Sequence, residues 1–152
     1  MFLVSDSSSS REERIKQILI EDPPLAALLA VIHFEWTIRR AIIALGTSPN
    51  IEIRERMKLD HGCDKYKQVW KDEVSPNIHK RLPEIVGNWD GLRRAFDLRH
   101  RLVHGIASCG REYAKKRVVH WAIAASTDVR AVCASHGINL EVRLPVRKRR
   151  RA

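Results

Sequence analysis

Cysteines are scarce in this sequence, and none has the spacing of a zinc site or a disulfide framework. Cys63, Cys109 and Cys133 are an odd number in 152 residues, and no C-x-x-C pair occurs. Small secreted domains that depend on cross-links carry more cysteines, usually in even numbers. We therefore expect a protein of the reducing cytoplasm that folds on an apolar core, without a metal or other cofactor.

Long hydrophobic runs are also missing. The longest uninterrupted apolar run, residues 25–32, is much too short to cross a bilayer. Residues 1–6 have neither a basic segment nor a long apolar segment, so no secretory signal is expected. No internal repeat and no G-x-S-x-G, Walker-type or H-E-x-x-H pattern occurs. These absences argue against membrane-spanning, secreted and fibrous proteins and against several common enzyme classes.

Positive charge is abundant in a chain that otherwise has a globular composition. Hydrophobic residues make up 44% and charged residues 30%, which fits one domain with its own core. The net charge of +10 predicts a polyanionic partner, with nucleic acid first and an anionic membrane surface second. Half of this charge lies beyond residue 140, where six basic residues accompany one glutamate: Arg143, Arg147, Lys148, Arg149, Arg150 and Arg151. Such a run is usually solvated, and it can bind phosphate backbones without sequence preference.

Apolar periodicity predicts an all-α fold, a compact helical bundle of four to six helices with a short extended, basic C-terminal tail. We divide the chain into a flexible leader (1–10), a helical domain (11–137) and an extended basic tail (138–152). Apolar residues recur at three and four positions, and period two appears only beyond residue 137. There Ile138, Leu140, Val142 and Leu144 alternate with polar residues, so a short strand that needs a partner strand or a groove is an alternative.

Local signals set the expected helix boundaries. Ser10 is a candidate N-cap for a first helix, and Pro23-Pro24 opens a second, amphipathic helix that Gly46 ends. Between residues 47 and 88 we expect short helices near 51–58 and 64–74. A further short segment begins at residue 75, and we expect Pro83 to end it. Asn88 or Asp90 caps a helix that continues to residue 103. The last long helix covers about 111–135 and stops at Gly137.

The most informative stretch is residues 96–105, Phe-Asp-Leu-Arg-His-Arg-Leu-Val-His-Gly. Arg99 and His104 are separated by four residues, with polar His100 after the arginine and an apolar pair before the histidine. Histidine titrates near neutral pH and suits general acid–base catalysis, whereas arginine offers phosphate a charged, planar fork. Other arginine–histidine pairs with similar spacing occur at 56/61, 94/100 and 130/136, but without this context.

This stretch resembles the R-x4-6-H motif of the HEPN superfamily, whose members are helical domains and often metal-independent ribonucleases. The resemblance extends over most of residues 11–137, and the helix that carries Glu35 and Arg39 is similar to the equivalent family helix. It implies an RNA endonuclease, toxin-like or defence-related, with Arg99 and His104 catalytic and His100, Glu35 and Arg39 supporting. It also implies RNA as substrate, a homodimer, and an antitoxin or other regulatory partner.

The helical geometry bears on this assignment. On an ideal straight helix, five positions place Arg99 and His104 about 140° apart. They converge only if the helix bends or if two copies of the motif meet. HEPN ribonucleases typically build a composite site from two protomers, and a two-fold interface presents the same surface twice. Cleavage by the RNA's own 2′-OH gives a 2′,3′-cyclic phosphate.

Several interpretations of the same residues compete with this one. His104 can interact with terminal carbonyls at a helix end, and Glu35 and Arg39 can form an ordinary surface pair. His100 and His104 are spaced to bind a metal, but no third ligand follows at a standard spacing, so no metal site is assigned. Arg93, Arg94 and Arg101 form a solvated basic face that can also guide RNA. The alternative function is a non-catalytic helical module that binds RNA or a protein.

Overall fold

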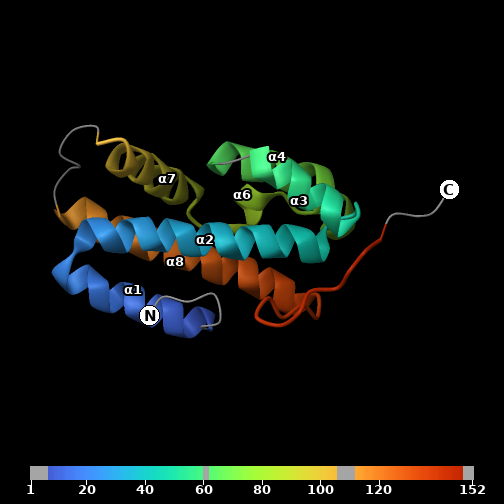
Figure 1. Ribbon diagram of the computed structural model, residues 1–152, viewed down its shortest axis with the longest axis horizontal. Helices are drawn as coiled ribbons and strands as arrows, with labels where there is room; N and C mark the ends of the chain where they lie inside the picture. The colour runs from blue at the N-terminus through green and yellow to red at the C-terminus, as the bar shows by residue number, and fades with distance from the viewer. Residues whose placement is uncertain (1–6, 60–61, 106–111, 149–152) are drawn as a thin grey trace. The chain divides into compact units, whose positions relative to one another are not determined.

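Eight helices make up the regular structure of the residues that the structure describes, and these residues form no strand (Figure 1). The structure is a computed structural model, which describes residues 7–59, 62–105 and 112–148, with side chains omitted for 112–114. Its helices are α1 (Ser8–Glu21), α2 (Pro23–Leu45), α3 (Asn50–Leu59), α4 (Cys63–Glu73), α5 (Ser75–Ile78), α6 (Leu82–Ile85), α7 (Trp89–Val103) and α8 (Glu112–Ser135). The predicted all-α fold is confirmed. Two helices of a single turn, α5 and α6, bring the total above the expected four to six.

The chain forms two compact units. The first comprises Met1–Glu35 and Asn88–Thr127, and the second comprises Trp36–Gly87 and Asp128–Ala152. Helices α2 and α8 therefore each contribute residues to both units. These units are defined by contacts in space, so each contains two separate stretches of the chain. The segments expected from the sequence, 1–10, 11–137 and 138–152, are instead continuous along the chain.

In the first unit, α1 begins earlier than the sequence analysis predicts. The side chain of Ser7 accepts a hydrogen bond from the Ser10 N–H at 3.1 Å, so Ser7 is the N-cap and the assignment of Ser10 is wrong. Within a run of four serines, several residues have a suitable side chain. The cap lies three residues earlier because Ser8 and Arg11 are both buried on the inner face of α1.

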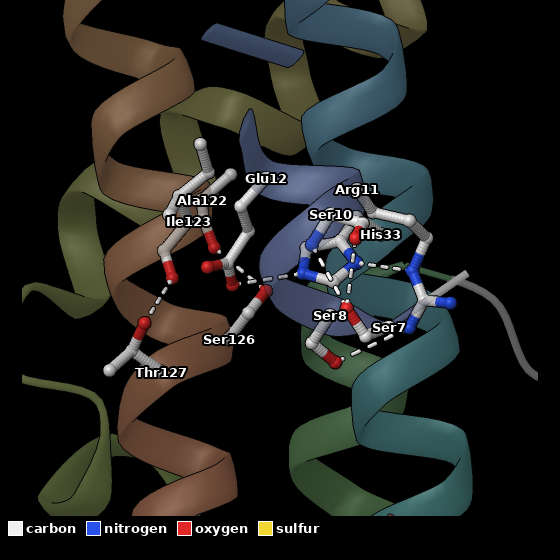
Figure 2. A network of polar contacts seen from close by, with 10 residues as sticks. All are labelled: Ser7, Ser8, Ser10, Arg11, Glu12, His33, Ala122, Ile123, Ser126 and Thr127. Atoms are coloured by element: carbon white, nitrogen blue, oxygen red, sulfur yellow. Dashed lines mark hydrogen bonds and ion pairs between the residues drawn. The ribbon is translucent and has the colours of Figure 1, made fainter. Parts of the chain in front are cut away.

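A buried polar network joins α1 to α2 in the first unit (Figure 2). Arg11 Nε donates to His33 Nδ1 at 3.3 Å, and His33 Nε2 lies 3.1 Å from a carboxylate oxygen of Glu12. Since Nδ1 accepts, the proton of a neutral His33 sits on Nε2 and points to Glu12. Two polar side chains of α1 thereby satisfy a histidine that is 1% exposed.

Helix α7 begins and ends where local signals predict. Asn88 accepts a hydrogen bond from the Gly91 N–H at 2.9 Å and is the N-cap. A Cβ on Gly91 would come within 2.8 Å of the Trp121 ring, so glycine allows this close packing against α8. At the other end the backbone turns at Gly105, whose φ of +63° is readily adopted only by glycine. Phe96 packs edge-to-face on Phe34 of α2, with ring centroids 5.9 Å apart.

The second unit is built around large buried side chains of α2, α3 and α4, namely Ile38, Ile42, Ile53, Tyr66, Val69 and Trp70. A Cβ on Gly46, directly after α2, would lie 2.6 Å from both the Ile42 carbonyl and the Ile53 side chain. The predicted glycine stop is therefore confirmed, and close packing explains it. Pro83 does not end a helix, because it stands in the first turn of α6, where proline is tolerated.

The segment after α8 belongs to the second unit, and several of its residues are anchored there. Leu140 and Leu144 are buried, and Arg40 donates from its guanidinium to the carbonyls of Leu140 and Val142. Arg147 donates to the carbonyls of Ile43, Ala44 and Ser48 at 2.6, 3.4 and 3.0 Å.

Arg147 thus satisfies carbonyls that the end of α2 leaves without an intrahelical partner. Burial lowers the pKa of Arg147 from its ordinary value, and the nearby charge of Glu73 opposes this shift. Arg147 is therefore not a freely solvated basic residue, whereas Arg143 and Lys148 are exposed.

We expect Arg147→Ala to lower the free energy of unfolding by ~1–3 kcal/mol, because three main-chain acceptors lose a charged donor. Arg147→Lys should recover little of this loss, since one ammonium cannot reproduce the planar fork. Urea unfolding monitored by circular dichroism measures the change. The control is Lys148→Ala at the exposed neighbouring position, which should leave stability unchanged. Equal effects at positions 147 and 148 would contradict a specific role for Arg147.

Candidate nucleic-acid interface and catalytic site

The candidate site lies on α7, in the first unit. The inward face of this helix carries Leu92, Ala95 and Phe96, which are buried. Its outward face carries Arg94, His100 and Arg101, and His104 follows directly after the last turn; all four are exposed. A helix with one apolar and one basic face can pack on the protein and bind an anion at the same time.

Arg99 follows Ala95 and Phe96 on the inward face, one turn further along α7, and is held by α2. Its guanidinium donates to a carboxylate oxygen of Glu35 at 2.8 Å, and the two side chains are 26% and 15% exposed. The guanidinium carbon also lies 5.6 Å from the centroid of the Phe96 ring, one turn earlier on α7. Charge pairing and the aromatic contact therefore restrict Arg99 to one position beside Glu35.

His104 is the C-cap of α7. Its backbone has left the helical conformation (φ −90°, ψ 3°), and its N–H donates to the His100 carbonyl. The rings of His100 and His104 lie against each other with centroids 4.4 Å apart. The structure thus places the candidate acid–base group on an exposed helix end, where a substrate could reach it.

Within one chain, Arg99 and His104 have different surroundings. Arg99 is directed to Glu35 on α2, His104 is exposed, and no hydrogen bond joins the two side chains among residues 7–59, 62–105 and 112–148. This arrangement agrees with the separation of about 140° that five positions give on a straight helix.

The remaining candidate residues lie outside this cluster. Arg39 belongs to the second unit, where its Nε donates to the Tyr66 hydroxyl at 2.7 Å. Arg147 is bound to main-chain carbonyls as described above, and Lys148 is exposed. The predicted RNA-binding residues Arg149, Arg150 and Arg151 lie outside the residues that the structure describes.

Sequence reasoning named Glu35 as a supporting residue but did not predict its pairing with Arg99, and it did not assign Phe96 to the site. The pairing of Glu35 with Arg99 joins residues 64 positions apart, so no local pattern could indicate it. Phe96, in contrast, stands three positions before Arg99, a spacing that places the two side chains together on a helix. That signal was available in the sequence.

Among the residues that the structure describes, no metal cluster and no exposed thiol is found. The described residues contain no group of three or more His, Cys, Asp or Glu side chains that could hold a metal ion. Cys63 and Cys133 are buried, and burial raises the pKa of the Cys133 thiol to about 12. A thiol that remains protonated at neutral pH is a poor nucleophile, so Cys133 has a packing role.

Comparisons with known proteins supply no relative: no family model, no curated protein and no solved structure matches the chain. Among the described helices, none combines the length and the apolar character that a membrane span requires. The functional argument therefore depends on the residues themselves.

We expect Glu35→Gln to lower the free energy of unfolding by ~1–2 kcal/mol, because a largely covered arginine loses its counter-charge. The matched control is Glu55→Gln, which removes the Glu55–Lys58 pair at 2.7 Å, with both side chains more than 60% exposed. That change should be close to neutral, as for most exposed pairs.

Denaturant unfolding of both variants, with a double-mutant cycle through Arg99→Met, isolates the energy of the Glu35–Arg99 pair. A coupling energy near zero in this cycle would show that Arg99 is not held by Glu35.

Proposed function

We propose that the protein is a metal-independent RNA endonuclease of the HEPN type, in which Arg99 and His104 act in a site composed of two protomers. The observation that carries the proposal is the 2.8 Å ion pair between Glu35 of α2 and Arg99 of α7. Helix α7 also presents the exposed side chain of His104 at its C-terminal end. A guanidinium fixed in this way and an accessible imidazole are the two groups that metal-free RNA cleavage needs.

RNA supplies its own nucleophile. The 2′-OH attacks the adjacent phosphorus, the bond to the 5′-oxygen breaks, and the products are a 2′,3′-cyclic phosphate and a 5′-OH. One proton leaves the 2′-OH and one reaches the departing 5′-oxygen. The two copies of His104 in a dimer can divide these transfers, one as general base and the other as general acid.

Arg99 stabilises the negative charge that develops on the phosphate during cleavage. Its guanidinium has five N–H donors, and the contact with Glu35 uses the NH1 nitrogen. The other donors are available to the phosphoryl oxygens, where negative charge increases in the transition state. Glu35 is then a positioning residue, which fixes the guanidinium before the substrate arrives.

The surrounding charge suits an RNA substrate. Arg94 and Arg101 are exposed on the same helix as the motif, and Lys148 is exposed in the second unit. With Arg149, Arg150 and Arg151 they supply sequence-independent phosphate contacts. The biological role that we propose is that of a toxin or defence effector in the cytoplasm, controlled by an antitoxin or another regulatory protein.

One observation favours a second candidate, a non-catalytic helical module that binds RNA or a protein. In the structure Arg99 is paired with Glu35, and an arginine that only stabilises the fold would look the same. This candidate retains the basic face of α7 as a binding surface and assigns no chemistry to His104. Cleavage assays separate the two candidates directly.

The proposed dimer brings the ends of two α7 helices together, and exposed Val103 is at this end (64% exposed). We expect Val103→Asp to weaken dimerisation, because the substitution places two charges at the interface. Sedimentation velocity over a range of concentrations measures the effect. The control is Ile20→Asp on α1, an equally apolar and even more exposed position (83%), which should leave the dimer intact. A wild-type protein that is monomeric at all concentrations would contradict the composite site.

We expect His104→Ala to lower RNA cleavage by ~10²–10⁴-fold, the usual cost of losing a general acid or base, and to leave the dimer intact. Arg99→Ala should lower both cleavage and phosphate binding, and Arg99→Lys should restore little. His100→Ala should have a smaller effect.

The control for these variants is His120→Ala, which removes another exposed histidine of the first unit, on α8. Cleavage of a mixed RNA pool should persist in EDTA and leave 2′,3′-cyclic phosphate ends. Full activity of His104→Ala, or RNA binding without any cleavage by the wild type, would leave the non-catalytic module as the function.

A further inference from the structure

Two histidine rings lie against each other at the exposed end of α7. His100 and His104 are one helical turn apart, with ring centroids separated by 4.4 Å and ring planes inclined by 52°. Both residues are exposed. In the part of the chain that the structure describes, neither imidazole has a hydrogen bond or an ion pair with a protein side chain. Both rings can therefore turn their nitrogens to a common ligand at little cost.

A pair of adjacent neutral imidazoles is a ligand set for divalent transition metals. Histidine at positions i and i+4 of a helix directs both rings to the same side, and imidazole nitrogen suits Zn²⁺, Ni²⁺ and Cu²⁺. Hard cations such as Mg²⁺ and Ca²⁺ prefer oxygen ligands and are not expected here. The C-terminal end of a helix carries partial negative charge, which favours a bound cation.

The neighbouring charges permit such a site and also limit its strength. Arg99 and Arg101 flank His100, and Arg99 is already paired with Glu35 at 2.8 Å, so part of its repulsion is offset. Arg101 is exposed, and solvent screens its charge. The described residues offer no group of three or more metal ligands, so the site that they form has two protein ligands. A site with two protein ligands binds less tightly than a structural zinc site with four.

We propose that His100 and His104 of one chain bind a single divalent transition-metal ion, and that the bound metal switches off the acid–base group. Binding itself depends only on the two rings. The regulatory part rests on the proposed function, because a metal-bound imidazole of His104 has no free lone pair to accept a proton. Transition metals are then inhibitors of the enzyme, whereas no metal is required for cleavage.

Calorimetric titration of the full-length chain with NiCl₂, after treatment with chelator and exchange into a non-coordinating buffer, tests the site. We expect one Ni²⁺ per chain, tighter binding of Cu²⁺ and none of Mg²⁺. His100→Ala and His104→Ala should each weaken Ni²⁺ binding by roughly tenfold or more, whereas His120→Ala should not change it. One ion per two chains, or the same affinity in all three variants, would overturn a site within one chain.

Amide hydrogen exchange supplies a second measurement that non-specific metal binding would not affect. The His104 N–H donates to the His100 carbonyl, and a metal across the two rings holds this last turn closed. Ni²⁺ should therefore slow exchange at the His104 amide in the wild type and leave it unchanged in His100→Ala. Equal protection in both proteins would contradict the proposal.

Activity then separates this inference from the proposed function. RNA cleavage that NiCl₂ inhibits and EDTA restores, with His100→Ala resistant to the metal, supports both. Cleavage without any specific Ni²⁺ binding overturns the metal site alone. Specific Ni²⁺ binding by a protein that cleaves no RNA overturns the ribonuclease and retains the site.

Discussion

The ion pair between Glu35 and Arg99 constrains everything that α7 presents to solvent. A guanidinium that is only 26% exposed needs a nearby counter-charge, and Glu35 on α2 provides it at 2.8 Å. The pair and the buried residues Leu92, Ala95 and Phe96 together set the rotation of α7 about its own axis. With that rotation set, Phe96 faces α2, whereas His100 and Arg101 face solvent. The same contact that stabilises the first unit thus decides which side chains are available for chemistry.

Most helix boundaries could be predicted because their signals are local. Asn88, Gly105 and Gly137 act through the conformation of a few neighbouring residues, and a sequence window contains all that is needed. The two errors came from signals with more than one meaning. Ser7 and Ser10 are equivalent as caps until the burial of α1 is known. Pro83 can stop a helix or occupy the first turn of the next, and packing selected the second.

The candidate site was only partly accessible to sequence reasoning. Spacing and residue type selected Arg99 and His104, and helical geometry predicted that one chain keeps them apart. The contacts that fix Arg99 depend on tertiary structure, since Glu35 is distant in the chain. Sequence reasoning also failed for Arg147. Its charge suggested that it binds RNA, but in the fold its guanidinium binds carbonyls at the end of α2. A basic residue in a charged run can thus have a structural role that composition does not reveal.

Arg147 recognises main-chain oxygens, and this has a consequence for how the sequence can evolve. The carbonyls of Ile43, Ala44 and Ser48 are the same whatever side chains those positions carry. Substitutions there leave the acceptors in place, so they can accumulate without a compensating change at position 147. Among descendants of this chain the arginine would be retained while its contact positions diverge. Its partners would then leave no trace of covariation.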